Sequence, residues 1–296
     1  MQGAVSPEWC AHHVKVRCNA PPGAFSVRIV PTPYSPAGVV WLASYPKSGN
    51  TWARFLICNL LYGKQESAQD LARLLPDLHE TGVARAPAEG LLKTHFPYSA
   101  ELPNIARTIA AIYIVRDPAD VLISNYFYAQ RSTAVSAESS AAAFDEYVDA
   151  FIEHRGDPRW IERGMASWEV NVRSWFAEPK PFPILRLRYE DMSKDPRAAC
   201  RRIAQLLGVG AAEPDIAAAA RNSSFQRMRE IERADIENKR QGIFYKPYLA
   251  PSIEAGRRFM RRGLPGDGRA RLSAGQRARL HEALGPLLEE LGYPPA

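Results

Sequence analysis

The 296-residue chain has only four cysteines and lacks any long run of apolar residues. The scattered thiols of Cys10, Cys18, Cys58 and Cys200 are too few for a disulfide framework, so we expect reduced cysteines and a cytoplasmic protein. A membrane-spanning helix needs roughly 18 consecutive apolar residues, and no stretch approaches that length. The N-terminal residues also lack the basic stretch and apolar core of a signal peptide. We therefore expect no membrane interaction.

Two further classes of ligand have little support in the sequence. The stretch CAHHVKVRC, residues 10–18, contains cysteine and histidine, but its spacing matches no common zinc pattern. The formal net charge of +6 favours an anionic ligand or an acidic partner. Much of the excess is arginine spread along expected helices, which is more typical of solvated helix faces than of a nucleic-acid groove. We therefore expect no metal site and no nucleic-acid partner.

The order of apolar segments predicts a single α/β domain. Residues 1–37 are rich in proline, contain at most one short strand, at 25–30, and are interpreted as an N-terminal extension. The domain then spans 38–296, in which 222–270 is mostly polar and is interpreted as a long excursion over one face. Nearly continuous apolar runs are typical of strands covered on both faces. They predict four strands, at 39–44, 90–94, 108–115 and 182–188.

Helices are expected between these strands and at the C-terminus. Asp117 and Asp195 each precede a proline, which is the usual arrangement of an N-cap and first helical residue. Gly208 suits the end of the second of these helices. A further helix is expected to begin at Ser273 and to end at Gly292. Strands that alternate with helices imply a central parallel sheet flanked by helices, with right-handed crossovers.

The segment YPKSGNTW, residues 45–52, joins the first expected strand to a helix. A strand, a tight polar turn and a helix form the usual seat for an anion at a helix N-terminus. Backbone amides of 48–51 can point at a phosphate, Gly49 permits a close approach, and Lys47 adds a positive charge. In a Walker A loop the lysine follows the last glycine, whereas here it precedes the glycine. An ordinary turn with a surface lysine is the alternative.

YPKSGNTW resembles the 5′-phosphosulfate loop of sulfotransferases that use 3′-phosphoadenosine 5′-phosphosulfate (PAPS). Later segments resemble further elements of this family in the same order, namely KTHFP (93–97), IVRDPADVLISNYFY (114–128), LRYEDM (187–192), SSFQRMR (223–229) and RRGLPGDGR (261–269). The resemblance covers residues 39–270. It implies a P-loop nucleotide-kinase-like fold and transfer of a sulfuryl group from PAPS to a hydroxyl of a small molecule, which leaves adenosine 3′,5′-bisphosphate.

The resemblance also implies which residues hold the donor. Arg116 and Ser124 would bind the 3′-phosphate, while an ion pair with a neighbouring carboxylate is the alternative role for Arg116. Trp52 and Phe225 are candidates for stacking on the base, with packing in the core as their alternative role. The complete set of candidate donor-binding residues is Lys47, Ser48, Gly49, Asn50, Thr51, Trp52, Arg116, Ser124, Tyr189, Ser223, Phe225, Arg261, Arg262 and Gly263.

Three residues are candidates for catalysis. His95 follows the strand at 90–94, and an imidazole with a pKa near 6.5 can accept the proton of an attacking hydroxyl. A structural role is the alternative for this histidine. Lys47 would stabilise charge on the bridging oxygen of the leaving group, and Lys93 would orient groups or balance charge on the sulfuryl oxygens. A sulfuryl group carries less charge than a phosphoryl group, so no metal is required.

The sequence leaves the acceptor and the oligomeric state open. Aromatic side chains after the 3′-phosphate motif suit an apolar or aromatic acceptor, and they are Tyr126, Phe127, Tyr128, Phe144, Tyr147 and Trp160. The stretch at 133–143 is small and polar and is interpreted as a flap. Gly268 replaces a tryptophan common in the family, which suggests a missing packing residue. A nucleotide kinase and a non-catalytic protein that binds adenosine bisphosphate are the alternative functions.

Overall fold

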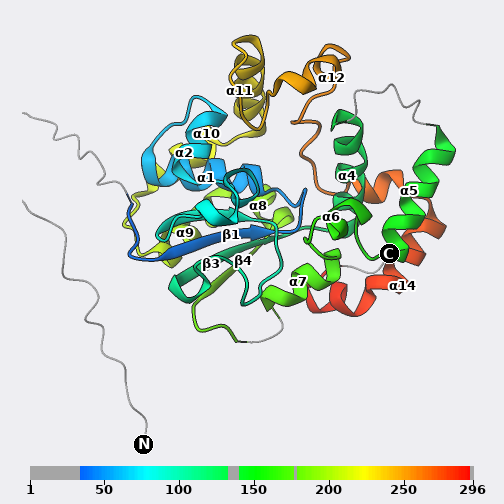
Figure 1. Ribbon diagram of the computed structural model, residues 1–296, viewed down its shortest axis with the longest axis horizontal. Coiled ribbons are helices and arrows are strands. Elements are labelled where there is room, and N and C mark those ends of the chain that lie inside the picture. The colour runs from blue at the N-terminus through cyan, green and yellow to red at the C-terminus, as the bar shows by residue number, and fades with distance from the viewer. Residues whose placement is uncertain (1–33, 133–139, 177–178, 294–296) are drawn as a thin grey trace, which may run out of the picture. The chain divides into compact units, whose positions relative to one another are not determined.

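The computed structural model describes residues 34–132, 140–176 and 179–293. These described residues form one compact unit around a four-stranded parallel sheet with the strand order β2-β1-β3-β4 (Figure 1). The strands are β1 (Val39–Ser44), β2 (Gly90–Thr94), β3 (Thr108–Val115) and β4 (Ile184–Arg188). The predicted parallel sheet is therefore confirmed, with β4 beginning at Ile184 rather than Phe182.

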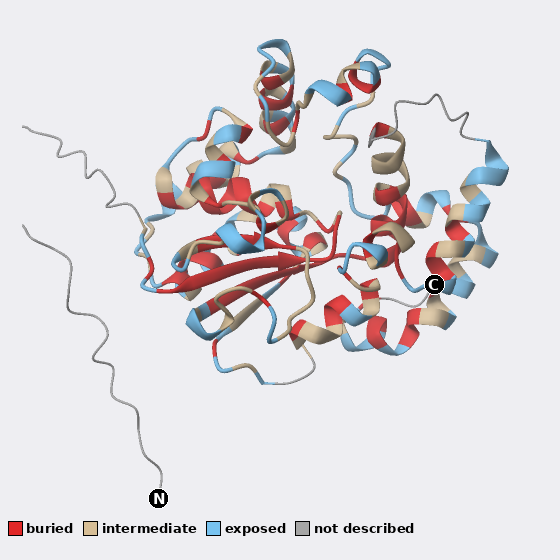
Figure 2. Cartoon of the chain, in the orientation of Figure 1, coloured by how far each residue is buried: buried red, intermediate tan, exposed pale blue. Residues whose placement is uncertain are grey.

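The two central strands explain why their sequences are apolar without alternation. Every residue of β1 is buried, as is the second half of β3 (Figure 2). Alternate side chains of β1 enter two separate hydrophobic cores, because Val39, Trp41 and Ala43 pack in one core and Val40 and Leu42 in the other. Successive residues of a strand point to opposite faces, so helices must cover both sides of this sheet.

Helices form a layer against each of these cores. Val40 and Leu42 share their core with α1 (Asn50–Tyr62), α2 (Ala68–Leu74), α9 (Pro196–Leu207), α10 (Glu213–Asn222) and α11 (Phe225–Glu237). The opposite core contains residues of α3 (Leu78–Thr81), α4 (Pro118–Ser132), α5 (Ala141–Glu153), α6 (Pro158–Glu162), α7 (Trp168–Phe176) and α14 (Ala274–Glu290). The shorter helices are η1 (Val83–Arg85), η2 (Ile105–Arg107), α8 (Tyr189–Lys194), η3 (Pro247–Leu249), α12 (Ala250–Glu254) and α13 (Asp267–Arg271).

The predicted helix ends are largely confirmed. The carboxylate of Asp117 accepts a hydrogen bond from the amide of Ala119, and Asp195 caps α9 through the amide of Ala198. Gly208 ends α9 in the left-handed conformation, with φ of 65°. At the C-terminus Ser273 and Gln276 form a complete capping box, and α14 ends at Glu290, shortly before Gly292.

The polar segment at 222–270 is more regular than its sequence suggests. It contains α11, whose buried positions include Glu232 and Asp235 as well as Met228 and Ile231. These carboxylates accept backbone amides, Glu232 from Phe259 and Met260 and Asp235 from Ala68. Charged residues on the inward face weaken the apolar periodicity, which is why the sequence alone did not predict this helix.

Some expectations lie outside the described residues, namely the strand at 25–30, the metal-like stretch at 10–18 and most of the flap at 133–143. Cys58 and Cys200 lie in α1 and α9 as buried, unpaired thiols. Within the described ranges no helix has the length and apolar character to cross a membrane.

Candidate active site

A cavity of about 820 Å³ opens where the strands end. Its walls include the turn after β1, the end of β2, the residues after β3 and β4, and the segment that precedes α13. Carboxyl ends of parallel strands are the usual place for ligands in open α/β sheets. Every donor-binding and catalytic candidate from the sequence lines this cavity except Ser48, which is buried beside it.

The turn between β1 and α1 has the backbone of an anion seat. Lys47 and Gly49 both adopt positive φ, at 70° and 100°. A Cβ atom on Gly49 would overlap the ring of Tyr189, so only glycine fits here. No side chain caps the N-terminus of α1 and its first turn has no acidic residue, which leaves its amides able to bind an anion. The buried hydroxyl of Ser48 has no hydrogen-bond partner among the described residues.

Lys47 is a half-buried cation without a carboxylate partner in the described part of the chain. Its ammonium nitrogen lies 4.1 Å from the centroid of the Tyr128 ring and 4.3 Å from that of Phe259. Burial, together with the positive charges of Arg131 and Arg116, lowers the pKa of Lys47 to about 7. An anion in the cavity would favour the protonated form of this lysine.

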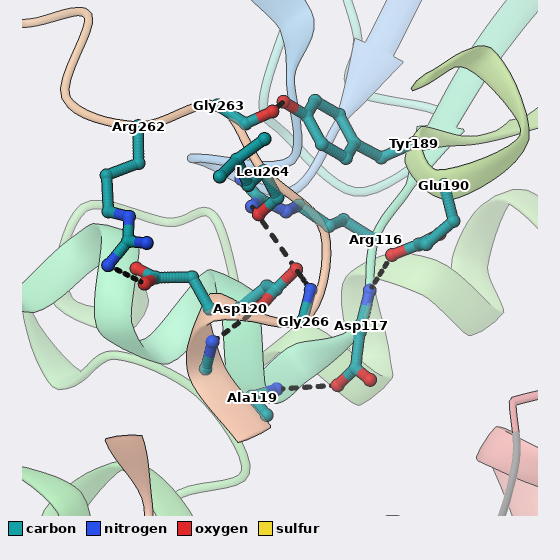
Figure 3. Close-up of polar contacts among 12 residues, drawn as sticks. Arg116, Asp117, Ala119, Asp120, Tyr189, Glu190, Arg262, Gly263, Leu264 and Gly266 are labelled. Atoms are coloured by element: carbon teal, nitrogen blue, oxygen red, sulfur yellow. Dashed lines mark hydrogen bonds and ion pairs between the residues drawn. The ribbon is translucent and has the colours of Figure 1, made fainter. Parts of the chain in front are cut away.

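Arg116 lies in the cavity and is also tied to the protein. Its guanidinium stacks on the Tyr189 ring at 4.1 Å, pairs with Asp120 at 3.3 Å and donates to the carbonyl of Leu264 at 3.2 Å (Figure 3). The ion pair considered as its alternative role is therefore present. Because Nε of Arg116 has no partner among the described residues, the guanidinium keeps an unused donor.

The segment that precedes α13 is fixed to α4 by Asp120. The carboxylate of Asp120 accepts the amides of Gly266, at 3.0 Å, and Gly268, at 2.6 Å (Figure 3). A Cβ atom on Gly268 would overlap the backbone of Ala119. The suggestion that Gly268 marks a missing packing residue is therefore wrong, since the absence of a side chain is what lets α13 approach α4.

The remaining donor candidates lie around this segment. The hydroxyl of Tyr189 donates to the carbonyl of Gly263 at 2.7 Å, and a Cβ atom on Gly263 would overlap the Phe225 ring. Arg261 and Arg262 both pair with Asp267. Other candidates keep contacts of their own: Trp52 lies edge-on to Tyr189 with centroids 5.4 Å apart, and the buried Ser223 hydroxyl accepts from Asn59.

His95 is placed as a neutral imidazole. Its Nδ1 lies 2.7 Å from the carbonyl oxygen of Ser44, which can only accept, so Nδ1 carries the proton and Nε2 has the lone pair. Burial lowers the pKa of His95 well below its usual value, and the charges of Lys93 and His79 add to this effect. The backbone carbonyl of His95 accepts from Asn171 at 2.8 Å. A neutral imidazole with a free lone pair can accept a proton.

Comparison with known proteins decides the family. The model of the family described as "Sulfotransferase domain" matches residues 38–292. The chain belongs to the sulfotransferase family. This confirms the resemblance drawn from the sequence motifs and identifies the chain as a sulfotransferase.

Curated relatives and solved structures agree with this family. The chain is 30% identical over 244 residues to "Flavonol 3-sulfotransferase" of Flaveria bidentis, which covers 77% of this chain and 74% of the relative. It is 26% identical over 254 residues to "Amine sulfotransferase" of Oryctolagus cuniculus, covering 81% and 77%. A crystal structure of mouse sulfotransferase SULT7A1 complexed with PAP has a TM-score of 0.61 at 22% identity, covering 86% of this chain and 88% of the other. This structural likeness confirms the P-loop-like α/β fold.

The sulfotransferase cavity contains functional candidates that the sequence reading missed. Lys93 pairs with Asp77 at 2.8 Å, so its ammonium is held by a carboxylate that also caps α3. His79 accepts the backbone amide of His95 at 2.8 Å, and the two rings stack with centroids 5.5 Å apart. Burial lowers the pKa of His79 to about 4. The two residues that the sequence did not predict are Asp77 and His79, at the start of the short helix α3 that precedes β2. No recognisable motif marks this segment, and the capping aspartate was its only signal.

The aromatic residues proposed for the acceptor divide into two groups. Tyr128 and Trp160 line the cavity, with ring centroids 6.1 Å apart. The others do not line the cavity as the described residues define it: Phe127, Phe144 and Tyr147 pack against the core, and the ring of Tyr126 contacts the rings of all three. Aromatic rings of α4 and its neighbouring helices thus line the cavity in some cases and pack away from it in others. The spacing of these residues in the sequence did not distinguish the two groups. No cluster of histidine, cysteine or carboxylate within the described ranges could hold a metal ion.

Proposed function

We propose that this sulfotransferase moves a sulfuryl group from PAPS to a hydroxyl of a small-molecule acceptor. One observation carries the proposal: the uncapped turn with Lys47, the pair of Arg116 and Ser124, and the neutral imidazole of His95 all face one cavity. Structures of mouse sulfotransferase SULT7A1 and of retinol dehydratase, both in complex with PAP, resemble this chain and support a donor of this chemistry.

The residues present fit such a donor at both ends. Near the turn, the amides of 48–51, the unpartnered Ser48 hydroxyl and the unpaired Lys47 suit the 5′-phosphosulfate. At the other end, Arg116 has a free Nε, and Ser124 faces the cavity from α4, so this pair suits the 3′-phosphate. We assign the flanking Trp52, Phe225, Tyr189, Ser223 and Arg261–Gly263 to the nucleotide.

The chain's own residues would perform an in-line displacement at sulfur. The bound donor supplies a sulfuryl group attached to a phosphate leaving group. Nε2 of His95 takes the proton of the acceptor hydroxyl as its oxygen bonds to sulfur, while the bridging bond breaks and its electron pair passes to phosphate. Lys47 and the amides of 48–51 stabilise the charge that develops on the bridging oxygen of the leaving phosphate. The carboxylate of Asp77, held by Lys93, favours the positive imidazolium.

Three further assignments belong to this proposal. The catalytic domain spans 38–296, preceded by residues 1–37 as an extension, a boundary supported by the family match at 38–292. The cations Lys47 and Arg116 supply the positive charge, so the transfer needs no metal. The protein acts in the reducing cytoplasm, which the unpaired thiols of Cys58 and Cys200 support.

Ligand-dependent melting tests the donor assignment. We expect adenosine 3′,5′-bisphosphate to raise the melting temperature strongly, because a ligand specific for the native state stabilises it, while AMP and Mg·ATP have little effect. Equal shifts with AMP would remove the roles of Arg116 and Ser124, and a dominant shift with Mg·ATP would favour a nucleotide kinase.

Replacement of His95 tests the chemistry separately. In His95→Ala, transfer of labelled sulfate from PAPS is expected to fall by at least about 100-fold, because the general base is lost, while bisphosphate affinity stays near normal. Lys47→Ala is the comparison and is expected to weaken both. Near-full turnover by the His95 variant would contradict the assignment of the base, and bisphosphate binding without turnover in the wild type would favour a non-catalytic protein.

A further inference from the structure

Helix α4 presents two residues to the cavity beyond the one that is assigned to the donor. Ser124, Tyr128 and Arg131 all line the cavity, and their spacing of four and then three residues places them on one face of the helix. Ser124 belongs to the proposed donor end, so Tyr128 and Arg131 lie about one and two turns farther along α4. This part of the wall continues past the donor site.

Arg131 is a buried cation whose charge is only partly balanced. Arg131 is 4% exposed, its Nη2 donates to the carbonyl of Phe244 at 2.7 Å, and its buried Nε has no partner among the described residues. Among the described residues no carboxylate forms an ion pair with it. Glu232 acts on it from a longer distance, with both carboxylate oxygens bound to the amides of Phe259 and Met260. Burial of a charge is costly unless a partner compensates it.

A second unpaired arginine lies on the same part of the wall. The guanidinium of Arg163 lies 5.2 Å from the centroid of Trp160, whose ring is 6.1 Å from that of Tyr128. No ion pair to Arg163 exists within the described ranges. Both Arg131 and Arg163 act electrostatically on the Tyr128 hydroxyl, so the two cations converge on the wall that Tyr128 and Trp160 form.

The carboxylates of the cavity wall are already neutralised. Asp77 pairs with Lys93 at 2.8 Å, and Glu80 pairs with Lys246 at 3.1 Å. They are the acidic residues among those that line the cavity. The wall near Tyr128 therefore carries positive charge that the described carboxylates balance only in part, and a negatively charged ligand would neutralise the remainder.

We propose that Arg131 and Arg163 form a subsite for an anionic group of the acceptor, so that the enzyme sulfates hydroxyl compounds that also carry a carboxylate or phosphate. This inference rests on the proposed function and names the acceptor class for the same site. A cationic acceptor is disfavoured because it would meet like charge. That contrasts with the amine acceptor named for the rabbit relative.

Matched phenols test the proposal. The acceptors are 4-hydroxybenzoate, 4-hydroxyphenyl phosphate, the neutral methyl 4-hydroxybenzoate and the cationic tyramine, each measured as kcat/KM with PAPS. The wild type is expected to prefer the anionic acceptors over the neutral ester by about tenfold or more, with tyramine poorest. The carboxylate and phosphate arms show which anion the subsite prefers.

Substitutions connect this preference to the two arginines. Arg131→Met and Arg163→Met are each expected to lower the ratio of anionic to neutral kcat/KM at least about fivefold, because methionine keeps bulk without charge. Arg279→Met is the matched control, since Arg279 is exposed, pairs with Asp149 and does not line the cavity. Its ratio should equal that of the wild type. A variant that lowers kcat/KM equally for all acceptors would assign that arginine to the donor or to folding and overturn the subsite.

Binding provides a readout that does not depend on turnover. Calorimetry with protein saturated by adenosine 3′,5′-bisphosphate should show tighter binding of 4-hydroxybenzoate than of its methyl ester, and this difference should disappear in Arg131→Met. Equal binding of acid and ester by the wild type would overturn the subsite while leaving the donor assignment intact. If the bisphosphate itself failed to bind, the proposed function and the subsite would both be wrong.

Discussion

At the scale of single residues, the unusual feature is a lysine whose pKa lies far below the usual lysine value in the absence of an anion. Burial against two aromatic rings, together with nearby cations, lowers the pKa of Lys47 to about 7, and no carboxylate among the described residues pairs with it. Phosphate oxygens next to the ammonium would favour the charged form and raise the pKa again. Binding of the donor and protonation of Lys47 are therefore coupled.

This coupling predicts the pH dependence of nucleotide affinity. The free protein holds the proton only below about pH 7, while the complex holds it to higher pH, so affinity for adenosine 3′,5′-bisphosphate should be nearly constant below pH 7. Above that pH it should fall by up to about tenfold per unit. Calorimetry between pH 6 and 9, in buffers of different ionisation enthalpy, measures both the affinity and the proton uptake.

The lysine can be tested against a permanently charged residue. Lys47→Arg keeps the positive charge across this range, so its affinity, whatever its absolute value, should lose the decline above pH 7. A wild-type affinity that stayed flat to pH 9, with no proton uptake, would show that Lys47 is not next to the bound phosphate.

At the scale of elements, the contact between α4 and α13 holds the segment that precedes α13 in place. Asp120 accepts two amides of this segment, and Gly268 lies against the backbone of Ala119. Gly268→Ala should lower the free energy of unfolding by about 1–3 kcal/mol, because the added Cβ would overlap the backbone of Ala119, and a helix backbone cannot move aside as a side chain can. It should also weaken bisphosphate binding, since Arg261 and Arg262 move with the segment. Urea unfolding and calorimetry measure the two effects.

A second glycine in a helix serves as the control. Gly275 lies in the first turn of α14 and has open space where a Cβ atom would be, so Gly275→Ala should leave stability equal or raise it slightly. If Gly268→Ala behaved like Gly275→Ala, the close approach of α13 to α4 would not be a constraint on this fold.

Local signals were enough to predict most of these elements. The four strands followed from apolar runs, and three helix starts followed from Asp117, Asp195 and Ser273, because strand burial and capping depend on neighbouring residues. Helix α11 could not be predicted, since Glu232 and Asp235 face inward and are satisfied by amides distant in the sequence.

The site was predicted as a set of residues but not as a network of contacts. The motifs supplied nearly all the candidates that line the cavity. They did not indicate that Lys93 pairs with Asp77 or that His79 binds the amide of His95. These partners come from other segments and meet only through the tertiary fold, so the spacing of residues in the sequence does not predict them.

At the scale of the whole molecule, the half-buried imidazoles of His79 and His95 connect the site to folding stability. His79 and His95 have folded-state pKa values below their usual value near 6.5, which they regain on unfolding. As pH falls below about 6.5 the unfolded chain therefore binds more protons than the folded one, and stability must decrease. Glu190 and Glu232 act in the opposite direction, because burial raises their pKa values.

A substitution at His79 isolates this contribution from the carboxylates. Between pH 7 and 5 the wild type should lose roughly 2 kcal/mol more unfolding free energy than His79→Gln, since glutamine does not titrate while its oxygen can still accept the His95 amide. Urea unfolding at both pH values measures the difference, and His154→Gln on the exposed end of α5 is the control, expected to keep the wild-type dependence. Equal losses in wild type and His79→Gln would mean that His79 has the same pKa in the folded and the unfolded chain, so that the folded protein carries a protonated His79 below about pH 6.5. A positive charge would then lie beside His95, and the neutral imidazole on which the proposed proton transfer depends would have to be reconsidered.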